Sequence, residues 1–168
     1  MITAEVRQEH ERFSVMSAVV DGDINALREK VKSWEKRYQN EGCPFRHEYF
    51  NFSNETRQSP LHLAALNGRL EIARLILDTP ETKINAINGK GDTALHLAAR
   101  EEFFDICCLL ADRKALIVRN FAGETPLAVT KSPSIGSIVL CREQEITREQ
   151  GIDFCPGPVG FNTKGVQS

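Results

Sequence analysis

The sequence predicts an all-α solenoid of about four helix-turn-helix units. Residues 58–77 align with residues 92–111 at a constant offset of 34 residues. Each aligned segment opens near a Ser or Thr that suits a helix N-cap, and its apolar residues recur at helical spacing. A period of about 33 residues is typical of repeat architectures, because one helical hairpin cannot bury its own apolar face and copies therefore stack.

The second and third units share one design, read from "SPLHLAALNGRLEIARLIL" and "DTALHLAAREEFFDICCLLA". In the second unit Ser59 and Pro60 suit the start of a short helix. The small residues of "LHLAA" let a neighbouring helix pack closely, and Gly68 turns the chain. The following "LEIARLIL" has the spacing of a second helix, so each unit is predicted to be a helical hairpin.

The outer units are more polar versions of the same design. A fourth copy begins at Thr125, at an offset of 32 from Thr93, and a first copy, "FSVMSAVVDGDINALREKV", places Gly22 on Gly68. End units of a stack need a more polar outer face, which agrees with this change in composition. The predicted organisation is an N-terminal extension at 1–12, units at about 13–53, 54–87, 88–119 and 120–145, and a Gly/Pro-containing tail at 146–168.

An aromatic insert interrupts the regular spacing. Gly22 and Gly68 lie 46 residues apart, against 34 for the next interval, so the extra residues fall within about 33–50. We expect the insert to lengthen the second helix of the first unit and to fold a loop back over the end of the stack. The alternative is that it forms a second binding surface, because long loops often carry function.

These motifs resemble the ankyrin repeat, whose pattern is approximately G-x-T-P-L-H-x-A-A-x-x-G-x-x-x-I-x-x-L-L. The resemblance implies that β-hairpin-like fingers join the helix-turn-helix units. The resemblance covers about residues 12 to 145 and is most specific in the second and third units. The sequence departs from the pattern at four places. Arg57 stands where the finger glycine is expected, Glu102 replaces the glycine between helices, and Met16 and Ala128 replace the histidine.

The resemblance implies a structural role for the histidine of each unit. In ankyrin repeats this side chain hydrogen-bonds backbone and the capping hydroxyl, and so ties neighbouring loops together. The matching residues are His62 with Ser59 and His96 with Thr93, while Thr125 is the matching cap of the fourth unit. A ligand or catalytic role for these histidines is the alternative.

The cysteines and the charged residues indicate no cofactor, no metal site and no catalytic site. Alignment places Cys107 on Ala73, towards the core, and Cys108 on Arg74, towards the convex surface. A structural zinc site needs four converging ligands, and no further Cys or His lies at ligand spacing near His96. The segment "NGKGDT" lacks the spacing of a phosphate-binding loop. We therefore expect a protein that is not an enzyme.

Composition and charge narrow the classes of partner that the chain is expected to bind. A net charge of −2 and a pI near 6.1 give no concentrated positive face, so no nucleic acid is expected. No run approaches the roughly 18 apolar residues that a spanning helix needs, so no membrane insertion is expected. The chain is predicted to be a cytoplasmic monomer with reduced thiols.

The predicted function is therefore recognition of another protein, as an adaptor or a bacterial-effector-like protein. In ankyrin proteins the partner usually meets the finger tips and the inner helices. The Glu-rich end of the fourth unit and the C-terminal tail weakly resemble the C-terminal translocation signals of bacterial effectors delivered by type IV secretion. An effector of that kind would act in the cytosol of a host cell. The alternative function is a stoichiometric inhibitor of an enzyme or signalling protein. The matching contact residues are Glu55, Thr56, Arg57, Gln58, Leu66, Asn67, Lys90, Asp92, Arg100, Glu101, Phe121, Glu124 and Lys131.

Overall fold

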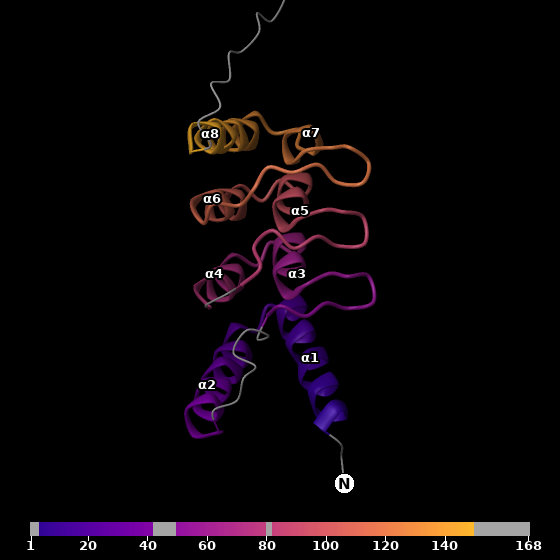
Figure 1. The fold of residues 1–168 in the computed structure, drawn as a ribbon, viewed down its shortest axis with the longest axis vertical. Helices are drawn as coiled ribbons and strands as arrows, with labels where there is room; N and C mark the ends of the chain where they lie inside the picture. Colours follow the sequence, from indigo (N-terminus) through magenta and orange to yellow (C-terminus); the bar gives the residue numbers. More distant parts are fainter. Residues whose placement is uncertain (1–3, 42–49, 80–81, 150–168) are drawn as a thin grey trace, which may run out of the picture.

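The computed structural model describes residues 4–41, 50–79 and 82–149, and these residues form four helical hairpins stacked in chain order (Figure 1). Within this part of the chain there are helices and no strands, as the predicted all-α solenoid requires. The helices are α1 (Ala4–Asp21), α2 (Ile24–Glu41), α3 (Pro60–Leu66), α4 (Leu70–Asp78), α5 (Ala94–Arg100), α6 (Phe104–Asp112), α7 (Pro126–Val129) and α8 (Pro133–Glu149).

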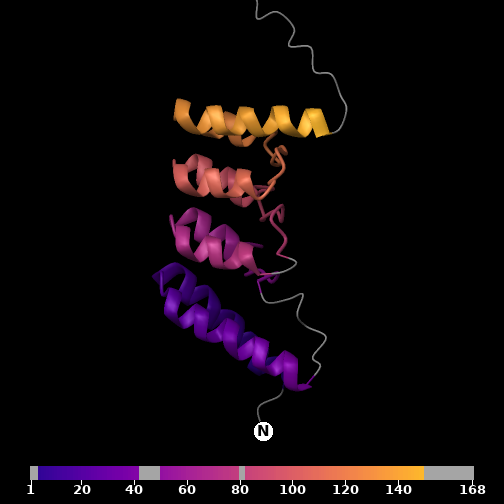
Figure 2. The same cartoon turned by 90° about the vertical axis from the view of Figure 1, so that its left-hand side faces the viewer.

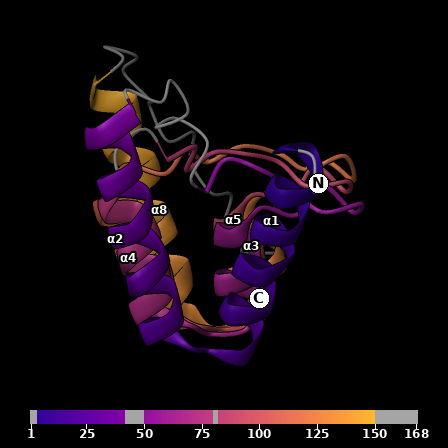
Figure 3. The same cartoon turned by 90° about the horizontal axis from the view of Figure 1, so that it is seen from below.

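The helices form two layers, one on each side of the core. The odd-numbered helices make the inner layer and the even-numbered helices the outer layer, and the loops between units extend beyond the inner layer (Figures 1 and 3). The view turned by 90° shows the outer layer as a stack that is regular from α4 to α8, with α2 inclined to it (Figure 2). The inner helices pack closely because they meet through the alanine pairs Ala64-Ala65 and Ala98-Ala99, all fully buried.

Each inner helix of the second to fourth units begins at a capping residue in extended backbone. Ser59 has φ −80° and ψ 166°, and Thr93 and Thr125 adopt nearly the same angles. Pro60 and Pro126 occupy the first helical turn, where a missing N–H costs nothing and the fixed φ suits the helix. The caps fix where each inner helix starts and therefore where each finger ends.

Each finger is a five-residue turn held by one asparagine. The second, third and fourth fingers are residues 54–58, 88–92 and 120–124. In each, the backbone N–H of the first residue donates to the carbonyl of the fifth, at 3.0, 2.9 and 2.9 Å. The side-chain Oδ1 of Asn54, Asn88 or Asn120 accepts from the N–H of that fifth residue, at 2.8, 3.0 and 2.9 Å. This satisfies the polar backbone of the turn from within.

The two residues that replace an expected glycine, Arg57 and Glu102, keep the left-handed backbone that glycine favours. Arg57 has φ +59°, at the position where the next two fingers have Gly91 (+77°) and Gly123 (+80°). Glu102 has φ +62°, at the position of Gly68 (+68°). The loop geometry of the repeat is therefore retained at both sites, and each side chain occupies left-handed backbone that disfavours L-residues.

Two predicted boundaries differ from the structure. The boundary after residue 12 falls inside α1, because residues 4–21 contain no Gly or Pro to interrupt the helix. The boundary after residue 145 falls inside α8, which ends at Glu149, shortly before Gly151. The remainder of the predicted tail, residues 150–168, lies outside the described residues.

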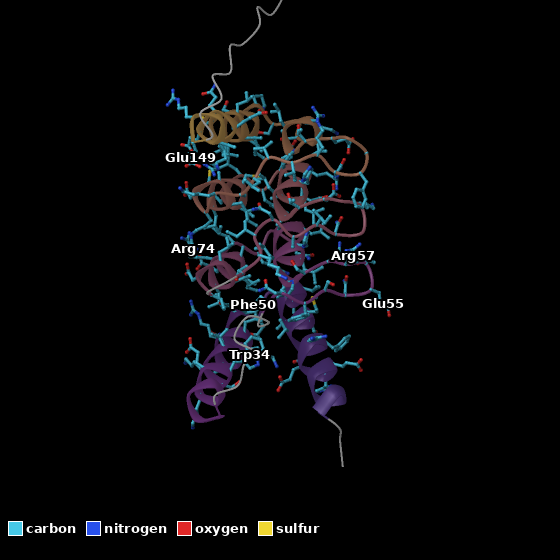
Figure 4. All side chains as sticks on the ribbon, in the orientation of Figure 1. Trp34, Phe50, Glu55, Arg57, Arg74 and Glu149 are labelled. Carbon is cyan, nitrogen blue, oxygen red and sulfur yellow. The ribbon has the colours of Figure 1, made fainter. Side chains whose placement is uncertain are left out.

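The aromatic insert is described at its two ends. Its first part lengthens α2 to 18 residues, twice the 9 residues of α4 and of α6. Phe50 is buried, and its ring meets that of Trp34 edge to face with the centroids 5.6 Å apart (Figure 4). This pair joins the outer helix of the first unit to the start of the second, which agrees with a packing role for these two residues. Residues 42–49 lie outside the described part of the chain.

Replacing Arg57 with Gly is expected to raise the free energy of unfolding by about 0.5–1 kcal/mol. Left-handed backbone costs an L-residue about 1–2 kcal/mol, and the extra chain entropy of glycine cancels part of the gain. Gly91→Ala should have the opposite effect, a loss above about 1 kcal/mol, because its φ is positive and its new Cβ would lie 2.7 Å from the backbone N of Phe121. Urea unfolding measures both changes, and a less stable Arg57→Gly variant would contradict this account.

Candidate protein-binding surface

The second and third units are joined by a buried histidine. His62 Nε2 lies 3.0 Å from the carbonyl oxygen of Asp92 in the third finger. Because a carbonyl only accepts, Nε2 carries the proton and donates it. Nδ1 of the neutral ring then accepts from the Ser59 hydroxyl at 2.7 Å and from the Ser59 N–H at 3.2 Å. One side chain therefore caps its own helix and holds the next finger.

His96 repeats this arrangement one unit further along. Its Nε2 donates to the carbonyl of Glu124 at 3.1 Å, and its Nδ1 faces the Thr93 hydroxyl at 2.9 Å and the Thr93 N–H at 3.2 Å. Both imidazole rings are almost completely buried. Every ring nitrogen of the two histidines thus faces a group of the repeat framework.

Burial lowers the pKa of both histidines, and hydrogen bonds to the backbone only partly oppose this effect. The neutral ring is also the form that the contacts require. Protonation of Nδ1 would remove the acceptor of the Ser59 and Thr93 backbone N–H groups and so break one of the two hydrogen bonds of each capping box.

Asp92 corrects the sequence prediction, which placed it among the surface contacts. Its side chain is fully buried and accepts two hydrogen bonds from Arg100, at 3.0 and 3.2 Å. A third bond, at 2.8 Å, comes from Asn120 Nδ2 of the fourth finger. Asp92 therefore connects the third finger, the end of α5 and the fourth finger, and its own side chain is not exposed.

The charge of Asp92 is maintained by its donors. Burial alone would raise the pKa of this carboxyl, but the hydrogen bonds from Arg100 and Asn120 outweigh that effect and lower it. The pair also raises the pKa of the Arg100 guanidinium. Arg100 is about one-third exposed (35%), so it is a fixed cation that reaches solvent at the end of α5.

The fingers bond to one another through their backbones. Gly89 N–H donates to the Thr56 carbonyl at 3.0 Å, and Phe121 N–H donates to the Lys90 carbonyl at 3.1 Å. The Phe121 ring lies against Gly91, where an added Cβ would come within 2.8 Å of Cδ1. Phe121 is nevertheless 70% exposed. A large aromatic ring thus stands on the fourth finger with a fixed backbone beneath it.

The other predicted contact residues lie on the fingers and at the ends of the inner helices, and they differ in how far their side chains are exposed. Leu66 is half-buried at the end of α3, and Asn67 caps that helix by donating to the Leu63 carbonyl at 2.8 Å. Lys131 N–H donates to Glu102 Oε1 at 3.2 Å. Gln58 is half-buried, and the remaining members are exposed, namely Glu55, Thr56, Arg57, Lys90, Glu101 and Glu124.

Sequence reasoning missed the importance of two asparagines. Asn88 and Asn120 are buried and organise the third and fourth fingers, and Asn120 also bonds to Asp92 and to Glu124 Oε2. The signal in the sequence was an Asn at the same position in each copy. Its contact with an aspartate 28 residues away in the chain was not readable from spacing.

The cysteines divide between core and surface. Cys107 is buried, and burial raises the pKa of its thiol to about 12. Cys108 is half-buried, and its pKa is raised by burial and by Asp112 and Asp105. Low-pKa thiolates are the reactive form of cysteine, so neither environment favours nucleophilic chemistry.

Among the described residues no cluster of three His, Cys, Asp or Glu side chains is arranged to hold a metal ion. No described helix combines the length and apolar character needed to cross a bilayer.

Comparison with known proteins agrees with this geometry. Residues 15–121 match the family model described as ankyrin repeats in three copies. A segment of 47 residues, 28% of this chain and 3% of its relative, is 45% identical to alpha-latroinsectotoxin-Lt1a of Latrodectus tredecimguttatus. A segment of 92 residues, 54% of this chain and 40% of its relative, is 27% identical to the probable 26S proteasome regulatory subunit p28 of Saccharomyces cerevisiae. The chain thus matches well under two thirds of either relative's length.

Stability is expected to fall as the pH falls below about 6.5. The folded-state pKa of His62 and His96 is lowered, so below that pH the unfolded chain takes up protons that the folded chain does not. The slope is at most about 1.4 kcal/mol per pH unit for each histidine. Urea unfolding between about pH 7.5 and 5 measures it. His62→Ala should be less stable at neutral pH and should show a shallower slope; an unchanged slope would assign the effect to other groups.

Removing either partner of the Asp92–Arg100 pair should destabilise the fold, but unequally. Arg100→Ala leaves a fully buried carboxylate with fewer donors and is expected to cost about 3 kcal/mol. Asp92→Ala leaves a guanidinium that solvent can reach, and we expect about 2 kcal/mol, mainly from the lost hydrogen bonds. Denaturant unfolding of the single and double variants measures the order and the coupling. The reverse order would show that burying the carboxylate without Arg100 costs less than losing the hydrogen bonds of Asp92.

Proposed function

This chain belongs to the ankyrin-repeat family of protein–protein interaction modules, and from that premise we propose that it is an adaptor that binds one protein partner through its finger tips and inner helices. The observation that carries the proposal is the exposed Phe121 ring on the fourth finger. Large aromatic residues on a rigid support are typical anchors of protein interfaces, because they bury much area and lose little conformational freedom.

The fourth finger is well ordered by its own contacts. The side chain of Asn120 accepts from the N–H groups of Ala122 and Glu124, at 3.0 and 2.9 Å. Arg119 donates to the Gly123 carbonyl at 2.7 Å. The backbone of Phe121 is held by Lys90 of the preceding finger. This pre-organisation reduces the entropy lost when a partner covers the ring.

The inner-helix ends supply further groups for the proposed surface. Leu66 and Arg100 occupy equivalent positions at the ends of α3 and α5, and Asn67 and Glu101 follow them. Because Asp92 accepts two hydrogen bonds from Arg100, Arg100 offers a pre-positioned cation to a partner carboxylate or carbonyl. Apolar anchors combined with a fixed cation and a carboxylate give both affinity and selectivity.

The role of one relative supports binding as the function. The yeast relative is named as a probable regulatory subunit of the 26S proteasome, which is a protein of a larger assembly. A regulatory subunit of an assembly binds other proteins, and that role fits an adaptor better than a catalyst.

The experiment is affinity capture with the full chain from its native cell or from a host cell, followed by binding measurements on the captured partner. Phe121→Ala together with Leu66→Ala should weaken binding about 30-fold or more, the size expected when an interface anchor is removed. Phe104→Ala is the matched control, since Phe104 is 46% exposed but lies on the outer helix α6. Equal affinity of the double variant and the parent would disprove this surface.

The same captured partner distinguishes an adaptor from an inhibitor. If the partner is an enzyme and keeps its activity in the complex, the adaptor proposal is supported. If one equivalent of this chain abolishes that activity, the inhibitor alternative replaces it. The measurement is a titration of partner activity against chain concentration.

A further inference from the structure

A hollow of about 240 Å³ lies between the bases of the second and third fingers, and sequence reasoning did not identify it. We call it the finger hollow. Its lining includes Asn51, Phe52, Ser53, Arg57, Lys83 and Ile87. Of these, only Arg57 belongs to the contact residues inferred from the repeat pattern. Figure 4 shows Arg57 and Glu55 on the second finger, beyond the inner helices.

The sequence differs between the two finger pairs at this place. Between the third and fourth fingers, the Phe121 ring covers Gly91. The corresponding pair between the second and third fingers is Gly89 and Arg57, at offsets of 32 and 34 residues. The third finger therefore carries no aromatic ring at the Phe121 position, and Arg57 lines the hollow.

Hydrogen bonds hold part of the lining of the finger hollow. Lys83 N–H donates to Asn51 Oδ1 at 2.8 Å. Ser59, a buried member of the lining, is held by its bonds to His62. The two fingers themselves are joined by the bond from Gly89 N–H to the Thr56 carbonyl at 3.0 Å.

The charged residues described in the lining of the finger hollow have one sign. They are Arg57 and Lys83, and none of the described lining residues is a carboxylate. Neither of these two cations has a carboxylate partner within the part of the chain that the structure describes. The Arg12 guanidinium lies 5.7 Å from the centroid of the Phe52 ring. Two cations that line one hollow and form no ion pair among the described residues favour an anionic ligand.

The finger hollow also has an apolar side, which separates it from a simple anion site. Phe52, Ala86 and Ile87 line it, and Ile87 is 40% exposed. Its volume is below the roughly 300–1,000 Å³ of pockets that enclose small-molecule ligands. The size suits one or two side chains of an extended segment whose remainder lies along the fingers.

We propose that the finger hollow binds an acidic segment of a partner protein, with a carboxylate at Arg57 and Lys83 and a neighbouring aliphatic side chain against Phe52 and Ile87. This inference rests on the proposed function, since it takes the chain to be a protein-binding module. It adds a second contact region, on the fingers, to the surface formed by Phe121 and the inner-helix ends. It also gives the class of sequence that a partner must carry.

The test uses the full chain and a short fluorescently labelled peptide built from Glu and Leu. Anisotropy should show saturable binding that weakens as salt is raised, because the contact includes exposed charges. Arg57→Gly with Lys83→Gln should weaken binding about tenfold or more. Arg57→Gly keeps the preferred backbone of the finger, so this variant is expected to fold. Arg74→Gln is the matched control, since Arg74 is an exposed cation on the outer helix α4, outside the hollow and outside the predicted contact residues.

Several outcomes would overturn the inference. A peptide with Lys in place of Glu that binds equally well would remove the charge argument. Competition by inorganic phosphate alone, with no loss on Ile87→Ser, would indicate a simple anion site. Self-association of the free chain that disappears in the double variant would make a second copy the occupant. If the peptide fails while Phe121→Ala and Leu66→Ala still weaken binding of the captured partner, this inference fails and the proposed function stands.

Discussion

The hydrogen bond from a buried histidine to the carbonyl of the next finger is the constraint on which the stack depends. His62 and His96 each hold a helix cap with one ring nitrogen and the following unit with the other. These hydrogen bonds fix the position and orientation of one helical hairpin relative to the next, with the alanine pairs of the inner helices buried between them. Without such a bond the apolar faces would still attract one another, but hydrophobic attraction alone is not directional.

The fourth unit, the last that the structure describes, lacks the histidine that makes this bond. The fourth unit has Ala128 at the histidine position, and Thr130 and Lys131 stand where the third unit buries Ala98 and Ala99. A histidine there would have no finger carbonyl to bond among the described residues. Ala128 and Lys131 are exposed, which gives this end a polar face suited to water.

Buried groups position the exposed residues of the proposed surface. Asp92 is buried, yet it accepts hydrogen bonds from Arg100 and from Asn120 of the fourth finger, which carries Phe121. A buried carboxylate therefore connects Arg100 to the finger that carries Phe121. In the finger hollow, Arg57 lines the space from a backbone conformation usually given to glycine, and the buried Ser59 of the same lining is held by His62.

The sequence by itself determined the repeat: its period, its caps, the helical hairpins and the layer that each apolar residue faces. These are local properties, set by spacing and by the preferences of Ser, Thr, Pro and Gly. Only the tertiary structure decided that Asp92 is buried, that Asn120 reaches it and that a hollow lies beside Lys83. Most of those outcomes depend on side chains about 30 residues apart meeting across the interface between units, and the geometry of that interface is not contained in any single repeat.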